Sequence, residues 1–82
     1  MFSETTALGR EITMKISARN VLEGKIVAVD KGATTAHVRL DIGGGKIVTA
    51  SITNEAVAEL ELQVGKTAYA VIKASNVMIA LP

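Results

Sequence analysis

The sequence TAHVRLDIGGGKIVTASI, residues 35–52, carries the clearest structural pattern in the chain. From Thr35 to Ile42 apolar residues alternate with polar ones, as expected for a strand with one buried face. Three glycines follow at residues 43–45, and residues 46–52 are again largely apolar and β-branched. We therefore predict a β-hairpin with its turn at the glycines. Val38, Leu40 and Ile42 share one face of its first strand, and His37, Arg39 and Asp41 share the other.

Shorter patterns on either side of this hairpin predict further strands. Residues 25–29 are rich in β-branched side chains and precede a turn at residues 30–32. Beyond the hairpin, residues 66–73 form a strand that is apolar on both faces, and residues 77–80 form a last strand. These patterns bring the predicted number of strands to five.

One segment, residues 53–60, has the period of a helix instead. Val57 and Leu60 fall on one helical face, and Thr53 or Asn54 can cap the first turn. The predicted order is three strands, one short helix and two strands. This order is typical of a five-stranded OB-like barrel, so we predict an all-β fold with one short helix.

The composition favours burial of apolar surface between subunits. The chain has 82 residues, enough for one domain with a marginal core, and is 49% hydrophobic but only 2% aromatic. So small a monomer has too little interior for this aliphatic content, and a strand that is apolar on both faces needs a second layer. We therefore expect an oligomer.

Charge and cysteine content exclude several classes of function. The net charge is +1 and tryptophan is absent, whereas a general nucleic-acid binder needs dense positive charge and stacking aromatics. The absence of cysteine excludes disulfides, thiolate catalysis and cysteine-based zinc sites. No apolar run has the length of a membrane span, and residues 1–13 lack a signal-peptide pattern. We expect a cytoplasmic protein that binds neither nucleic acid nor membranes.

The sequence predicts no enzyme active site. His37 is the only histidine, and it falls on a polar strand face without a nucleophile motif. The carboxylates are scattered, with no spacing typical of a glycosidase pair or a hard-metal cage. The triple glycine lacks the lysine and the strand-to-helix context of a phosphate loop. We therefore expect a binding protein.

Two short segments carry hydrogen-bond donors suited to an oxyanion. The first is Ser17-Ala18-Arg19-Asn20, where small side chains expose backbone N–H groups beside a hydroxyl, a guanidinium and an amide. The second, Lys73-Ala74-Ser75, again combines a cation, a small residue and a hydroxyl. Neither segment contains an acidic residue, as a dianion site requires. Each segment alone also fits an ordinary turn with a solvated charge, and only the pair together favours an oxyanion site.

With their flanking residues, the two segments resemble the signature motifs of the molbindins, the small molybdate-binding (Mop) proteins. The first motif is Ser17–Asn20 followed by Leu22-x-Gly24-x-Ile26, and the second is Val71–Ser75 followed by Val77. Residues 42–45, 51–53 and 62–66 also resemble the family. The resemblance implies a Mop domain over residues 14–82. It leaves residues 1–13 as an N-terminal tail or linker, which we expect to be flexible because its composition is polar and mixed.

The resemblance also implies a function and a set of site residues. The family assembles as a hexamer, a trimer of dimers, and binds molybdate or tungstate between subunits, with no side chain ligating the metal directly. Carried over by position, the oxyanion-binding residues are Ser17, Ala18, Arg19, Asn20, Lys73, Ala74 and Ser75. Thr53 matches a second kind of site near the threefold axis. The implied role is intracellular storage and homeostasis of the anion.

Two other functions stay open at this point. The same domain occurs in molybdate-responsive regulators, and a related module in transporter ATPase subunits, so the chain could sense the anion for one of these. An OB-type nucleic-acid-binding module is compatible with the fold class, although the aromatic platform is missing. Molybdate and tungstate are tetrahedral dianions of nearly equal size, so the residues do not separate them.

Overall fold

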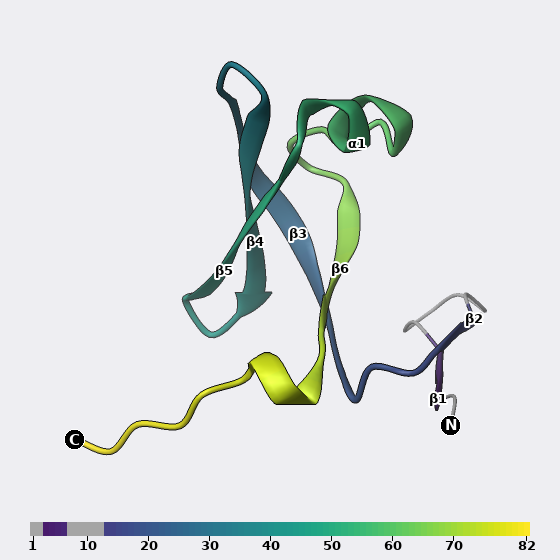
Figure 1. The fold of residues 1–82 in the computed structure, drawn as a ribbon, viewed down its shortest axis with the longest axis vertical. Helices are drawn as coiled ribbons and strands as arrows, with labels where there is room; N and C mark the ends of the chain where they lie inside the picture. Colours follow the sequence, from purple (N-terminus) through teal and green to yellow (C-terminus); the bar gives the residue numbers. More distant parts are fainter. Residues whose placement is uncertain (1–2, 7–12) are drawn as a thin grey trace. The chain divides into compact units, whose positions relative to one another are not determined.

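The computed structural model of the chain describes residues 3–6 and 13–82, with side chains from residue 16 onward. The chain divides into two compact units, one of residues 23–70 and one that combines the N-terminal segment up to Leu22 with residues 71–82. Figure 1 shows the elements, which are β1 (Ser3–Thr6), β2 (Thr13–Ile16), β3 (Asn20–Lys31), β4 (Thr35–Gly43), β5 (Lys46–Thr53), α1 (Asn54–Glu59), β6 (Thr67–Ile72) and the 3₁₀ turn η1 (Ala74–Asn76).

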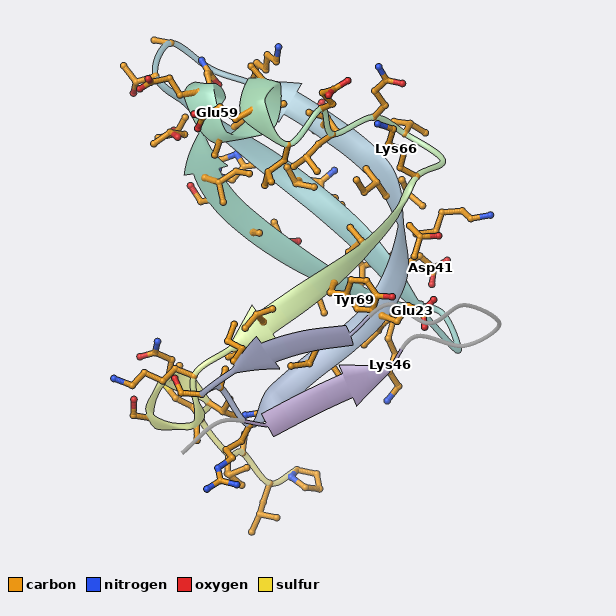
Figure 2. All side chains as sticks on the ribbon, turned by 90° about the vertical axis from the view of Figure 1, so that its right-hand side faces the viewer. Glu23, Asp41, Lys46, Glu59, Lys66 and Tyr69 are labelled. Atoms are coloured by element: carbon orange, nitrogen blue, oxygen red, sulfur yellow. The ribbon has the colours of Figure 1, made fainter. Side chains whose placement is uncertain are left out.

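The unit of residues 23–70 is built on the predicted hairpin. β4 and β5 pair antiparallel, with Thr35 opposite Thr53. All three glycines of the turn have positive φ angles, between 62° and 99°, which residues with a Cβ rarely adopt. Asp41 Oδ1 accepts a hydrogen bond from the Gly43 N–H at 2.8 Å, and Figure 2 labels Asp41 and Lys46 on the two strands that the turn joins. The hairpin prediction is confirmed.

β3 links the hairpin to β6 in a sheet of order β5-β4-β3-β6. It pairs antiparallel with β4, and a register shift between Ile26 and Ala28 marks a bulge. The Ile26 N–H donates to the Lys66 carbonyl at 2.9 Å, and the Ile26 carbonyl accepts from the Gly65 N–H at 2.8 Å. These bonds fix the buried Ile26 at the middle of the sheet.

Helix α1 begins at the predicted cap. Thr53 Oγ1 accepts a hydrogen bond from the Ala56 N–H at 3.1 Å, and Glu55 lies in the first turn, where a negative charge suits the helix dipole. Asn54 donates its backbone N–H to the Thr34 carbonyl and its Nδ2 to the Gly32 carbonyl, both at 3.0 Å. The helix start is thereby tied to the β3–β4 turn.

The core of this unit is small. It consists of Ile26, Ala36, Val38, Leu40 and Val57, the last contributed by α1. Because Val38 and Leu40 are buried while His37 and Arg39 are exposed, the predicted alternation along β4 is confirmed.

The N-terminal segment contains a strand that the sequence pattern did not predict. β1 pairs antiparallel with β2, with Ser3 opposite Ile16 and Thr6 opposite Thr13. Strand pairing is made by backbone groups, and the side-chain pattern reports it only where one face is buried. The rest of the tail that we expected to be flexible, residues 1–2 and 7–12, lies outside the described residues.

The predicted fifth strand is not formed. Residues 77–82 follow η1 without regular structure, and the main sheet has four strands (Figure 1). A strand is formed only where a neighbour pairs with its backbone, and no described strand pairs with this segment. The all-β class with one short helix is confirmed, whereas the five-stranded barrel is not.

Candidate functional site

The first donor segment connects two strands. β2 ends at Ile16 and β3 begins at Asn20, so Ser17, Ala18 and Arg19 form an irregular connection of three residues. The side chains of Ser17 and Arg19 are exposed, and Ala18 and Asn20 are half-buried. The segment therefore presents a hydroxyl and a guanidinium to solvent on backbone that lies outside the strand ladders.

The second donor segment closes β6 with a single 3₁₀ turn. Lys73 precedes this turn in an extended conformation, with φ −63° and ψ 136°. The turn is closed by hydrogen bonds from the Asn76 N–H to the Lys73 carbonyl (2.9 Å) and from the Val77 N–H to the Ala74 carbonyl (3.2 Å). Neither bond uses the N–H of Ala74 or Ser75, because these residues come first in the turn. Two backbone donors, a hydroxyl and an ammonium group therefore lie within three consecutive residues.

One hydrogen bond joins the two segments. Asn20 Nδ2 donates to the Ile72 carbonyl at 3.2 Å, although the two residues are 52 positions apart in the sequence. Asn20 directly follows Arg19, and Ile72 directly precedes Lys73, so the bond brings the ends of the donor segments together. Seven of the eight predicted site residues consequently lie in one compact unit.

The same bond defines what Asn20 can do. The side-chain amide has two N–H donors, and Ile72 takes one of them, so one donor remains for a ligand. Asn20 is therefore a clamp between the segments as well as a predicted anion donor. Sequence reasoning missed this role, because no local pattern reports a side-chain contact to a distant carbonyl.

The charge on the two segments is positive. Arg19 and Lys73 are their ionisable residues, and neither segment contains a carboxylate. Lys73 is exposed, and among the side chains of residues 16–82 no carboxylate forms an ion pair with it. Hydrogen bonds to an ionised partner are about twice as strong as neutral ones, so a lysine beside fixed N–H and hydroxyl donors suits an anionic ligand.

Thr53 lies in the other unit, residues 23–70. It is exposed at the end of β5, opposite Thr35, and its Oγ1 accepts the cap bond from Ala56. That bond occupies an oxygen lone pair and leaves the hydroxyl proton able to donate. The assignment of Thr53 to a second kind of oxyanion site stays a prediction.

The part of the chain that the structure describes was also searched for a metal site and for a membrane-spanning helix. It contains no group of three or more histidine, aspartate or glutamate side chains that could hold a metal ion. His37 is exposed on β4, and Arg39 on the same face pairs with Asp30 at 4.0 Å, in an exposed setting where ion pairs contribute little. No described helix has the length and apolar character needed to cross a membrane.

Known proteins match most of this chain. The family model described as "TOBE domain" matches residues 16–79, which include both donor segments and Thr53. "Molybdenum-pterin-binding protein 3" of Clostridium pasteurianum is 50% identical over 66 residues, which cover 80% of this chain and 97% of that protein. "Molybdenum transport protein ModE" of Herbaspirillum seropedicae is 48% identical over 66 residues, which cover 80% of this chain but 24% of that protein.

A solved structure agrees with the fold. The cytoplasmic molybdate-binding protein ModG, in a crystal form with molybdate bound, has a TM-score of 0.77 and 43% sequence identity. The match covers 99% of this chain and 55% of that chain. Sequence and fold therefore point to the same group of proteins.

Proposed function

Because the chain belongs to the TOBE domain family, and within it to the molybdenum-pterin-binding (Mop) proteins, we propose that it binds molybdate or tungstate as an intact oxyanion. The family assignment confirms the resemblance predicted from the two motifs. One observation carries the proposal: the Asn20–Ile72 hydrogen bond joins two donor segments that both lack carboxylates. A tetrahedral dianion needs several donors at once and no acidic neighbour, and this pair of segments meets both needs.

The residues of the proposed site have distinct roles. Ser17 and Ser75 donate hydroxyl protons, and the small alanines beside them let the anion approach the backbone N–H groups. Lys73 supplies positive charge as well as donors. Arg19 contributes mainly through its backbone, and Asn20 holds the two segments together.

We place the complete site in an assembly of copies. The proposed assembly is a hexamer, a trimer of dimers, in which residues 77–80 complete a five-stranded OB-like barrel and Thr53 contributes to a second kind of site. Exposed apolar side chains support it: Met78, Ile79 and Leu81 are 87–91% exposed, and Leu60 and Val64 are each 65% exposed. Monomeric proteins seldom leave so many large apolar side chains uncovered.

The proposed role is storage and homeostasis of the anion in the cytoplasm, without catalysis. Support comes from the C. pasteurianum protein, which this chain covers almost completely, and from ModG, which is described as cytoplasmic. Sensing is the second candidate, because ModE is a longer protein in which the part similar to this chain makes up 24% of the length. In that case the chain would act as the anion-sensing part of a regulator.

Native mass spectrometry with and without molybdate tests this proposal, since it reports subunit number and bound anions together. We expect six chains of 8.6 kDa with a defined number of bound molybdate ions. Sulfate at the same concentration is the control and should add no comparable mass. A spectrum of single chains without bound anion would contradict the proposal.

A further inference from the structure

The proposed anion site is rich in hydrogen-bond donors. Its two cations, Arg19 and Lys73, have side chains that donate and cannot accept. The bonds that close the 3₁₀ turn leave the N–H groups of Ala74 and Ser75 unused. A ligand that meets the second donor segment therefore meets two backbone donors beside an ammonium group.

The carbonyl groups of the same stretch are already engaged by the chain itself. The carbonyls of Ile72, Lys73 and Ala74 accept hydrogen bonds at 3.2, 2.9 and 3.2 Å. The first of these bonds joins the two donor segments, and the other two close the turn. The backbone of the second segment thus keeps donors for a ligand, whereas its carbonyls hold the fold together.

The side-chain acceptors of the two segments are neutral oxygens. They are the hydroxyls of Ser17 and Ser75 and the amide oxygen of Asn20. A hydroxyl that turns a lone pair toward a ligand proton gives up its own donation to that ligand. The amide is oriented by Ile72, because a carbonyl only accepts and so takes the amide nitrogen. Neither segment contains a carboxylate, which would be a charged and therefore stronger acceptor.

We propose that this site selects oxyanions by protonation: it binds tetrahedral dianions that carry no proton and rejects those that keep one. An O–H group on the ligand needs an acceptor. Where donors surround it, the O–H stays unpaired, and the protein donor that faces it loses its own acceptor as well. The mismatch therefore penalises a protonated anion twice, which is a way of excluding a competitor of similar shape.

Protonation divides the common tetrahedral oxyanions into two classes. Phosphate and arsenate keep a proton at neutral and mildly alkaline pH, whereas molybdate, tungstate, sulfate and selenate keep none. The site admits the second class, and size then ranks its members. This inference rests on the proposed function, because it concerns the same site, and it adds a criterion that is independent of size.

Arsenate and selenate separate the effect of the proton from that of size. Both are tetrahedral dianions of nearly equal size at mildly alkaline pH, and arsenate alone keeps a proton. Calorimetric displacement of bound molybdate from the wild-type protein, with each anion in large excess and at constant ionic strength, measures the two affinities. We expect selenate to bind at least about tenfold more tightly than arsenate, which is about 1.4 kcal/mol.

The outcomes separate this inference from the proposed function. Equal displacement by the two anions, or no displacement by selenate, would overturn the inference, while the binding of molybdate would leave the proposed function standing. A protein that binds no molybdate would contradict both.

An added acceptor tests the cause of the preference. Ser75→Asp places a carboxylate in the second donor segment, and its repulsion acts on both dianions alike, so the ratio of their affinities reports the proton. We expect the preference for selenate over arsenate to disappear in this variant. Ser75→Asn, which has a similar shape and no charge, is the matched control and should keep the preference. A preference that persists unchanged in Ser75→Asp would overturn the inference.

Discussion

Among the described glycines, Gly24 has the least space for a side chain. A Cβ at this position would lie 2.6 Å from the Asp41 carbonyl oxygen and 2.8 Å from Leu40 Cγ. Because the first of these atoms belongs to the backbone of β4, the strands would have to separate. We predict that Gly24→Ala lowers the free energy of unfolding by about 1–3 kcal/mol, as overpacking does elsewhere. Chemical denaturation measures this change. Glu23→Ala, at the exposed neighbouring position, should stay within about 0.5 kcal/mol of wild type.

Lys73 is the residue on which anion binding should depend most. Lys73→Ala removes charge as well as a donor and should weaken binding of every dianion, whereas Ser75→Ala removes one donor and should cost about tenfold in affinity. Arg19→Ala should have a smaller effect than Lys73→Ala, because the segment uses backbone donors at that position. Calorimetric titration with molybdate measures all three. Lys66→Ala is the matched lysine control, since Lys66 Nζ donates to the Glu61 carbonyl in the other unit. Normal binding by Lys73→Ala would place the site elsewhere.

At the scale of elements, the sequence predicted the parts that have a buried face or a local cap. The alternation around Val38 and Leu40 located β4 correctly, and Thr53 located the start of α1. Two features left no signal in the side-chain pattern, namely the β1–β2 pairing and the Asn20–Ile72 bond, and the second also depends on a distant partner. The strand pattern of residues 77–80 was present in the sequence, but a pattern specifies a strand only when a neighbour is available to pair with it.

The candidate site was likewise predictable from the sequence only in part. The residue types of both donor segments could be read from the sequence, and donors without acidic neighbours predict an anion site there. Their proximity could not be read, since it depends on a side-chain bond across the fold. The 3₁₀ turn that leaves the N–H groups of Ala74 and Ser75 unused was likewise visible only in three dimensions.

The N-terminal element should be dispensable for anion binding. All of the predicted donors lie between Ser17 and Ser75, and β1 contributes none of them. We predict that removal of residues 1–13 leaves molybdate affinity within about threefold of wild type, which is under ~0.7 kcal/mol. The same calorimetric titration measures this. A large loss would instead show that the pairing of β1 with β2, which ends directly before Ser17, holds the first donor segment in place.

At the scale of the whole molecule, the exposed apolar side chains favour an assembly of several chains. The described core contains five buried apolar residues, while large apolar side chains on β5, on β6 and in residues 77–82 stay exposed. We predict a stable oligomer, a hexamer, at micromolar concentration. Sedimentation velocity measures its mass, and a species of 8.6 kDa alone would contradict the prediction.

Selectivity among tetrahedral dianions tests the central claim most directly. A site of fixed N–H and hydroxyl donors selects its ligand by size, and sulfate, being smaller than molybdate, leaves some donors out of reach at on the order of 1 kcal/mol each. Calorimetric competition on the wild-type protein should therefore show at least about a hundredfold preference for molybdate over sulfate. Tungstate should bind within a few-fold of molybdate. Sulfate competing on equal terms with molybdate would contradict the account.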